Sequence, residues 1–269
     1  MRFLGFRHDG QSCIGVVAND LVTRLCTIDE FYADTARWLT TTPSGAAVPL
    51  AGIEQVPPVP TTSKILCLGL NYAAHVAETG RDKPEFPNVF ARWYSQLSCD
   101  GDEVPVPSGE PGLDWECELG VIIGSHLVDA PQDQAMDGVL GYTCFNDISA
   151  RKYQRATGQW ALGKNPDRSG PIGPVVVTAD EYGDPYGKAI MTRVNGETMQ
   201  SSTTDCMLFK IDEVIAYATR CLSLVPGDVI ATGTPEGVGG ARKPPVWMHP
   251  GDTCEVEIEG IGVLTSRIV

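Results

Sequence analysis

The sequence predicts a mainly β fold with a few helices, an α+β class, and three observations support it. Beyond about residue 113, apolar runs of strand length alternate with Gly and Pro turns, as in 120–124, 174–178 and 228–232. Helical spacing of apolar residues is clear in one long segment, 210–221. The chain has no Gly-x-Gly-x-x-Gly loop of the kind that opens a dinucleotide-binding α/β domain.

The elements before residue 113 divide the chain in two. Residues 1–60 alternate short strand-like pieces with turns and end in a proline cluster at 57–60. We therefore expect a small N-terminal β domain over 1–60 and a larger domain over 61–269. The second begins with a buried strand at 64–70 and a short helix at 71–80, for which Gly80 is the stop signal.

Composition narrows the class of partner. The net charge of −14 argues against nucleic acid or an anionic membrane surface. It does not exclude a small anionic substrate, because a bound cation and local Lys or Arg can invert the field in a site. The N-terminus lacks the apolar core of a signal peptide, and no apolar run is long enough to span a membrane, so we expect a cytoplasmic protein. The nine cysteines include no Cys-x-x-Cys pair and are typical of buried, reduced thiols.

Two acidic residues at alternate positions predict a metal site. In an extended strand over 113–119, Glu116 and Glu118 share one face, about 7 Å apart, while the apolar residues cover the other. Oxygen ligands of this kind suit a hard divalent ion. A solvated strand face is the simpler alternative. Asp147 ends the apolar run 141–147 and supplies a third carboxylate, although a turn or a helix N-cap would also explain it.

Three further features of the sequence suggest residues for catalysis or substrate binding. His75 and Glu78 share a helix face at i and i+3, where a carboxylate can orient an imidazole as a general base, although an exposed pair is common. Lys164 lies in a Gly- and Pro-rich segment that we expect to be a tight loop, where it could stabilise an oxyanion or enolate. The loop 231–239 offers backbone N–H groups and the Thr234 hydroxyl to a carboxylate, or is a structural turn.

Taken in order, these motifs resemble those of the fumarylacetoacetate hydrolase superfamily, over about residues 64 to 269. The resemblance implies a mixed β-roll with a short N-terminal β domain, and a homodimer. It also implies that Glu116, Glu118 and Asp147 hold Mg²⁺ or Mn²⁺, with Ca²⁺ as an alternative ion. By the same resemblance, His75 and Glu78 lie on a lid that orders over the substrate.

The resemblance also assigns contacts with a small anionic 2-oxo acid substrate. Lys164 and Gln154 would bind the oxygen on which charge develops, and Arg151 and Thr234 would contact the acid end. In the segment 90–95 the chain departs from its relatives: Arg92 could meet a second carboxylate, and the bulky Trp93 and Tyr94 could narrow the acyl pocket. The segment 239–248 could line the entrance of the site, although we expect a surface loop.

The activity implied is metal-dependent hydrolysis of a carbon–carbon bond in an acylpyruvate such as fumarylpyruvate, which gives pyruvate and a second acid. The same site could instead serve an isomerase or a decarboxylase of a 2-oxo acid, including oxaloacetate. A catalytically silent metal-binding homologue is the third alternative. Product analysis separates hydrolysis from decarboxylation, because cleavage gives pyruvate plus a second acid, whereas decarboxylation releases carbon dioxide.

Overall fold

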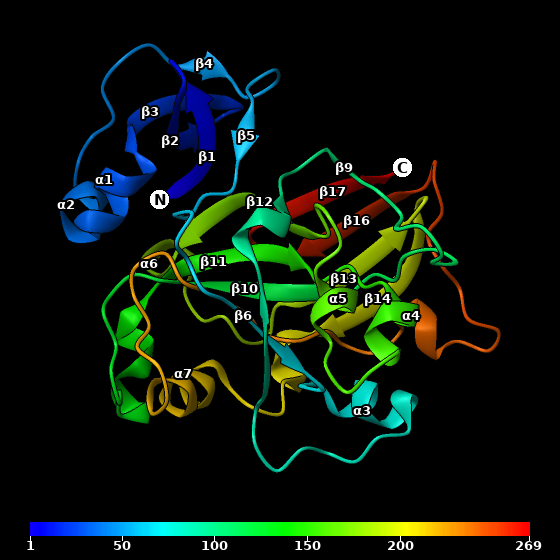
Figure 1. Cartoon of the computed structure of the whole chain (residues 1–269). Coiled ribbons are helices and arrows are strands. Elements are labelled where there is room, and N and C mark those ends of the chain that lie inside the picture. The colour runs from blue at the N-terminus through cyan, green and yellow to red at the C-terminus, as the bar shows by residue number, and fades with distance from the viewer.

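Strands dominate the computed structural model, which describes all residues 1–269 (Figure 1). They form a 12-stranded sheet and a five-stranded sheet, so the predicted fold class is confirmed. In spatial order the large sheet contains β4 (Val48–Pro49), β3 (Leu21–Thr27), β2 (Gln11–Ala18), β1 (Arg2–His8), β12 (Gly170–Thr178), β11 (Val139–Asn146), β10 (Cys117–Ile123), β15 (Val229–Ala231), β6 (Ile65–Gly69) and β7 (Asn88–Arg92). Two short strands join off this path: β5 (Gln55–Val56) pairs with β1, and β8 (Leu97–Ser98) pairs with β12.

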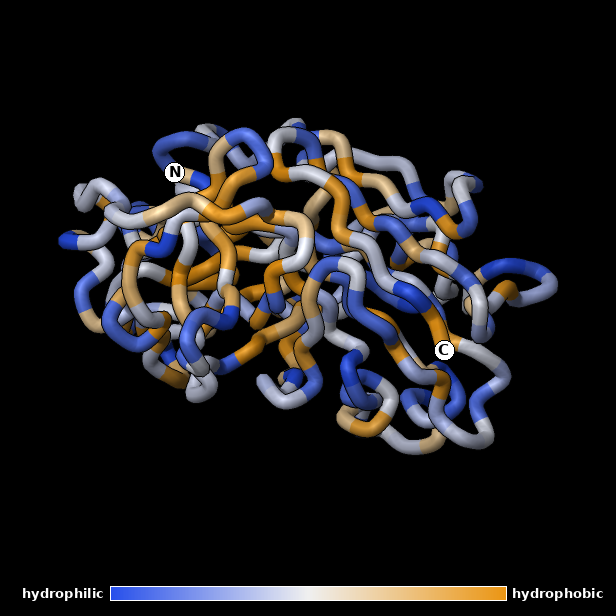
Figure 2. The backbone as a smooth tube through the Cα atoms, turned by 90° about the horizontal axis from the view of Figure 1, so that it is seen from above, coloured by the Kyte–Doolittle hydropathy of each residue, from blue (hydrophilic) through white to orange (hydrophobic).

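The smaller sheet closes over one face of the large one. Its spatial order is β14 (Glu197–Thr203), β13 (Ala189–Val194), β16 (Thr253–Ile258), β17 (Gly262–Ile268) and β9 (Asp102–Val104). Cys117 and Leu119 of β10 lie in one core cluster with Val256 of β16 and Leu264 of β17, and all four are fully buried. Figure 2 shows the hydrophobic residues along the packed strands and the hydrophilic ones mainly in the loops. This core fixes the strand that carries the predicted metal ligands.

The helices are short and lie around the sheets: α1 (Ile28–Ala33), α2 (Thr35–Leu39), α3 (Ala73–Thr79), α4 (Arg151–Arg155), α5 (Ala161–Lys164), α6 (Ala179–Tyr182) and α7 (Ile211–Thr219). The predicted helices at 71–80 and 210–221 are α3 and α7, and Gly80 caps α3 in the left-handed conformation at φ 66°. Periodicity did not predict α1 and α2, which are too short to show it. None of the helices is both long enough and apolar enough to cross a membrane.

Residues 1–60 extend the large sheet. Strand β1 pairs antiparallel with β12, and Phe3 and Ile14 share a core cluster with Ile172 and Val176 of that strand. In Figure 1 this unit lies at one end of the molecule, joined to the rest through the edge of β12. The division at residue 60 stays a prediction.

Strand β10 begins later than predicted, at Cys117 rather than residue 113. The preceding residues make only isolated bridges, from Leu113 to Met248 and from Asp114 to Ser149. The ladder with β11 pairs Cys117 with Asn146, and the Asp147 N–H donates to the Glu116 carbonyl at 2.9 Å. This register brings the end of β11 beside the Glu-x-Glu segment, although the two segments lie about thirty residues apart.

Candidate active site

Three buried carboxylates gather where β10 and β11 meet. Glu116, Glu118 and Asp147 each present an oxygen within 4.8 Å of the others. Glu118 and Asp147 are fully buried and Glu116 is 5% exposed. A solvated strand face, the simpler alternative for Glu116 and Glu118, is therefore wrong. Asp147 caps no helix, since α4 begins at Arg151.

Buried cations surround this cluster. Lys164 Nζ donates to Glu116 Oε2 at 2.6 Å and also pairs with Asp147. Arg151 donates through Nη2 to Glu116 Oε1 at 2.5 Å. Burial acts to raise the pKa of Glu116, but the positive charges of Arg151 and Lys164 outweigh it and hold that pKa far below its ordinary value. Burial acts in turn to lower the pKa of Lys164, but Asp147 and Glu116 raise it. The side chain of Lys164 is therefore a charged ammonium. Lys164 is the last residue of α5, whereas the sequence predicted that it would lie in a loop.

Glu118 is the carboxylate left without a cationic partner. Its Oε2 accepts the Gly233 N–H at 2.8 Å, and its Oε1 is buried with no hydrogen-bond partner. Burial, together with the charges of Asp147 and Glu116, raises its pKa well above the ordinary range. An orphaned carboxylate oxygen beside two other carboxylates suits a hard divalent cation with oxygen ligands. The residues present therefore fit Mg²⁺ or Mn²⁺.

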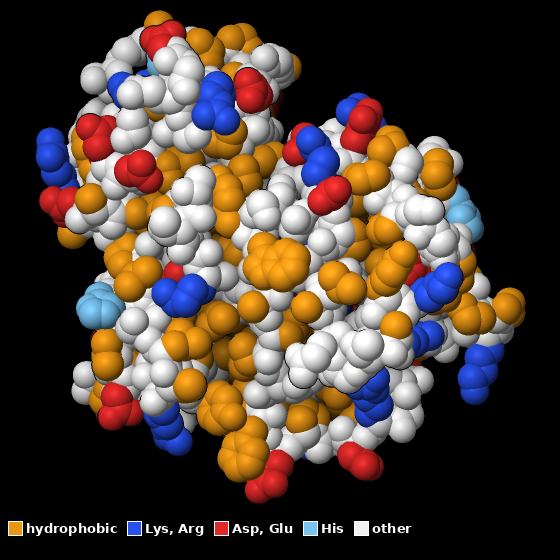
Figure 3. All heavy atoms as spheres, viewed as in Figure 1, with side chains coloured by type: hydrophobic (Ala, Val, Ile, Leu, Met, Phe, Trp, Pro, Cys, Tyr) orange, Lys and Arg blue, Asp and Glu red, His pale blue; other side chains and the backbone are white.

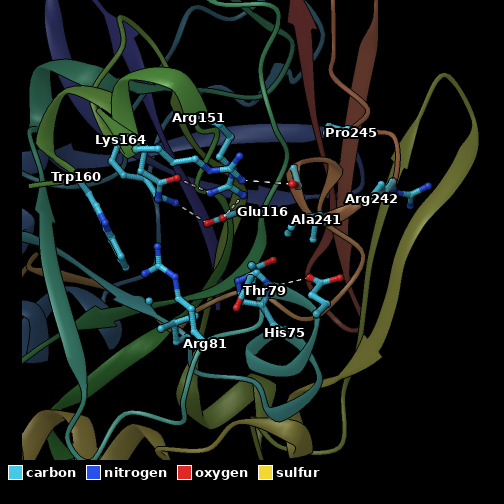
Figure 4. Close-up of a pocket in the computed structure, with 18 of the residues that line it drawn as sticks. His75, Thr79, Arg81, Glu116, Arg151, Trp160, Lys164, Ala241, Arg242 and Pro245 are labelled. Carbon is cyan, nitrogen blue, oxygen red and sulfur yellow. Dashed lines mark hydrogen bonds and ion pairs between the residues drawn. The ribbon is translucent and has the colours of Figure 1, made fainter. Parts of the chain in front are cut away.

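The predicted acid–base pair forms at the opposite wall. His75 Nδ1 lies 2.7 Å from Glu78 Oε1, and the histidine residue is 7% exposed. The other oxygen, Glu78 Oε2, accepts the Gly237 N–H at 2.9 Å. Because Nδ1 faces a carboxylate, the proton is held at Nδ1 and Nε2 is left as the basic nitrogen. Figure 4 shows His75 on one side of the pocket and Lys164, Arg151 and Glu116 on the other.

Both groups face one cavity of about 450 Å³. The predicted residues that line it are His75, Glu78, Glu116, Arg151, Gln154, Lys164 and Thr234. Glu118 and Asp147 lie deeper in the wall, fully buried. The Gln154 side chain is held by Arg151 Nη1 at 2.9 Å, and the Thr234 hydroxyl by Gln200 at 2.8 Å. The geometry thus unites the predicted residues, while their roles in catalysis and binding stay predictions.

Arg92 is the exception. Its side chain is fully buried and is not part of the cavity wall. The guanidinium pairs with Asp147 and donates to Ser169 Oγ at 2.9 Å and to the Ile148 carbonyl at 2.5 Å. The predicted contact with a substrate carboxylate is corrected accordingly, because the buried guanidinium uses each of its three nitrogens to donate to the protein. Arg92 instead positions Asp147.

Several residues of the site were not predicted. Asp114 is fully buried and accepts from Arg151 Nε at 2.7 Å and from the Gly239 and Gly240 N–H groups. Asp114 lies two residues before Glu116 and so continues the alternate spacing of Glu116 and Glu118. This spacing could have indicated that Asp114 belongs to the site. The cavity is also lined by Arg81, Phe90, Arg155, Trp160, Ala241, Arg242, Lys243 and Pro245. Residues 240–243 and 245 therefore line the cavity, which agrees with the alternative named for the segment 239–248 rather than with the expected surface loop.

Comparison with known proteins shows the family to which the chain belongs. Residues 64–269 match the family model described as fumarylacetoacetate (FAA) hydrolase C-terminal. The mitochondrial oxaloacetate tautomerase FAHD2A of Bos taurus is 37% identical over 266 residues, which cover 98% of this chain and 78% of that protein.

Solved structures cover the whole chain. A 5-carboxymethyl-2-hydroxymuconate delta-isomerase from Mycobacterium smegmatis superposes with a TM-score of 0.82 at 33% identity, covering 100% of this chain and 99% of its own. A maleylpyruvate hydrolase from Sphingobium sp. SYK-6, in complex with manganese(II) ion and pyruvate, gives 0.80 at 28% identity with the same coverage. The similar proteins thus include a tautomerase, an isomerase and a hydrolase.

Proposed function

Because the chain belongs to the fumarylacetoacetate hydrolase family, we propose that it hydrolyses the C3–C4 bond of an acylpyruvate to pyruvate and a carboxylic acid. The observation that carries the proposal is the His75–Glu78 pair, which faces the carboxylate cluster and Lys164 across one cavity. A base and an anion-stabilising group on opposite sides of a substrate are what addition of water to a ketone requires.

Mg²⁺ or Mn²⁺ held by Glu116, Glu118 and Asp147 would supply Lewis-acid stabilisation of negative charge on the 2-oxo acid. Glu78 holds the Nδ1 proton of His75, so Nε2 removes a proton from water. The hydroxide adds to C4, and the C3–C4 bond then breaks, with its electron pair passing to C3. The imidazolium returns its proton to C3, which completes pyruvate. The Lys164 ammonium stabilises the oxyanion that forms when water adds.

A relative at 37% identity favours a second candidate function. The Bos taurus protein named oxaloacetate tautomerase FAHD2A matches 98% of this chain. Tautomerisation needs only that a base move a proton between C3 and the 2-oxo oxygen, which His75 could do without water. Decarboxylation of oxaloacetate also proceeds through an enolate. The three reactions differ in product: hydrolysis gives pyruvate with a second acid, tautomerisation gives the enol form alone, and decarboxylation gives pyruvate with carbon dioxide.

The test is pyruvate release from fumarylpyruvate, acetylpyruvate and benzoylpyruvate, with Mg²⁺, with Mn²⁺ and with EDTA. Oxaloacetate is followed in parallel for enol absorbance and carbon dioxide. Metal-dependent pyruvate release supports the hydrolase, and a change in oxaloacetate enol alone supports the tautomerase. No turnover of any substrate despite stoichiometric metal would support the silent metal-binding homologue.

The His75→Ala variant tests the base. We expect kcat to fall by roughly 10²–10⁴-fold, the usual contribution of a general base. His126→Ala is the matched control, because His126 is exposed and lies outside the cavity. Near-normal turnover by His75→Ala would contradict the mechanism.

We also propose that the enzyme is a homodimer. Trp93, which directly follows β7, is 51% exposed, and Leu162, which lies on α5, is 67% exposed. Strand β7 and helix α5 pack together. Apolar side chains gather over the middle of the face in Figure 3, with charged ones mostly around its edge. Exposed apolar area of this kind is typical of an interface between chains. Light scattering after size exclusion would give twice the 28.9 kDa mass of one chain.

A further inference from the structure

The outer part of the cavity is lined by arginines that have no acidic partner. Arg81 and Arg155 form no ion pair, and both are exposed at the mouth. The only hydrogen bond of Arg155 runs to the Gly240 carbonyl at 3.3 Å. The inner cations differ, since Arg151 and Lys164 each contact two carboxylates. The cavity of this acidic protein is therefore neutralised at its inner end and positively charged at its outer end.

Arg242 differs from Arg81 and Arg155, because the protein holds its guanidinium group in place. It also lines the cavity, but its Nη2 donates to the Met199 carbonyl at 2.9 Å, and its guanidinium lies 5.5 Å from the Trp115 ring centroid. These contacts hold it in the wall. Figure 4 shows the Arg81 guanidinium pointing into the pocket, on the side of Trp160.

Arg155 lies beside the inner cation Arg151 and shares the cavity with Arg81. A Cβ added at Gly240 would lie 3.0 Å from Arg155 Nη2 and 3.3 Å from Arg151 Nε, so the guanidinium groups of Arg155 and Arg151 flank the same backbone. Burial lowers the pKa of Arg155, and the charges of Arg151 and Arg81 add to this effect, while those of Asp114 and Glu110 oppose it. Like charges brought together in this way favour an anion between them.

An aromatic wall connects the inner end to Arg81. Lys164 Nζ lies 5.2 Å from the Phe90 ring centroid, and Phe90 meets Trp160 edge-on at 5.4 Å between centroids. The Arg81 guanidinium lies in turn 5.5 Å from the Trp160 ring. From the carboxylate cluster outward, the wall therefore presents a polar end, two aromatic rings and a cation.

We propose that the acyl group of the substrate ends in a second carboxylate, which Arg81 and Arg155 bind, while its middle packs against Phe90 and Trp160. This inference rests on the proposed function and narrows it to dicarboxylic 2,4-dioxo acids. Guanidinium groups bind carboxylates through paired, charge-assisted hydrogen bonds, and aromatic rings suit a flat, unsaturated chain. A neutral acyl group would leave both arginines without a partner.

A pair of substrates that differ only at the far end tests the proposal. Fumarylpyruvate ends in a carboxylate, and crotonylpyruvate carries a methyl group at the same position. We expect Arg81→Gln and Arg155→Gln each to lower kcat/KM for fumarylpyruvate by roughly tenfold or more, as loss of a charge-assisted hydrogen bond predicts. The value for crotonylpyruvate should change by less than about threefold. Arg37→Gln, an exposed arginine on α2, controls for loss of one charge. Equal losses on both substrates, or no loss, would overturn the subsite.

A binding measurement separates this inference from the proposed function. The uncleavable pair 2-oxoheptanedioate and 2-oxoheptanoate has the same seven-carbon length and differs in the same way, and calorimetry with and without Mn²⁺ gives both affinities. We expect the wild type to prefer 2-oxoheptanedioate by roughly tenfold, and Arg81→Gln and Arg155→Gln to lose that preference. If no acylpyruvate is cleaved but the preference is found, the hydrolase proposal fails and the subsite stands. Equal affinities in the wild type would refute the subsite whatever the activity.

Discussion

At the scale of single residues, Asp114 connects three parts of the site. Its Oδ1 accepts the N–H groups of Trp115 at 2.9 Å and Gly239 at 2.7 Å. Its Oδ2 accepts the Gly240 N–H at 2.8 Å and Arg151 Nε at 2.7 Å. One buried carboxylate thus fixes the Glu-x-Glu segment, the loop that walls the cavity and the arginine that contacts Glu116.

Asp114→Asn should weaken both stability and activity. An amide keeps one acceptor oxygen and turns an NH₂ group toward donors, so a buried ion pair is broken at a cost of about 3–5 kcal/mol. Asp228→Asn is the matched control, since Asp228 is equally buried, pairs with Lys64 and accepts two N–H groups away from the cavity. Urea unfolding should show losses for both variants, and kcat/KM should fall only for Asp114→Asn. Equal kcat/KM in the two folded variants would mean that Asp114 has no positioning role.

Arg92→Lys tests the corrected role of that residue. A lysine keeps the charge but cannot reach Asp147, Ser169 and the Ile148 carbonyl together, as the planar guanidinium does. We expect Mn²⁺ affinity, measured by calorimetry, to weaken by about 10–100-fold, as is usual when a partner of a metal ligand is changed. KM at saturating Mn²⁺ should stay unchanged. A raised KM with unaltered metal affinity would restore the substrate contact that the sequence suggested.

At the scale of elements, features within one segment were predictable and features between segments were not. The face shared by Glu116 and Glu118, the helix pair His75–Glu78 and the Gly80 cap each follow from local spacing. Arg81, Trp160 and the wall at 239–245 come from segments far apart in the chain, so only the packing of the sheets reveals that they converge. The role of Arg92 was predicted wrongly for the same reason: its partner Asp147 lies on another strand end.

Helix α3 is joined to the loop 231–239 by the hydrogen bond from the Gly237 N–H to Glu78, and Gly237→Ala should break this bond. Gly237 has φ +99°, and a Cβ there would lie 2.4 Å from the Met199 carbonyl oxygen, so the loop must shift. The Gly237 N–H then leaves Glu78, and we expect kcat to fall about tenfold or more with Mn²⁺ affinity unchanged. Gly251→Ala is the control, because φ is +101° and a Cβ meets nothing within 4 Å. Similar kcat values for the two variants would show that the contact does not position the base.

At the scale of the whole molecule, burial should protect most thiols. All nine cysteines are free, and only Cys206 and Cys221 are exposed. Burial raises the pKa of Cys26 to about 12, so its reactive thiolate is scarce at pH 8. A thiol reagent at pH 8 should modify two cysteines in the native protein and all nine in denaturant. Rapid modification of more than two would show that the core opens readily.

Residues 1–60 and the large domain should depend on each other for stability. They share the β1–β12 pairing and a core cluster that includes Phe3 and Val176. Without residues 1–60, β12 becomes an open edge beside exposed apolar side chains, so we expect the 61–269 fragment to aggregate.

Point variants test the same dependence without deletion. Phe3→Ala removes a ring that is fully buried in the shared cluster and should cost about 3–5 kcal/mol. Phe86→Ala is the control, since Phe86 is 56% exposed and should change stability little. If the two parts form one cooperative unit, Phe3→Ala lowers a single unfolding transition in urea, followed by far-UV circular dichroism and tryptophan fluorescence. Two separate transitions, with only one shifted, would instead show independent domains divided near residue 60.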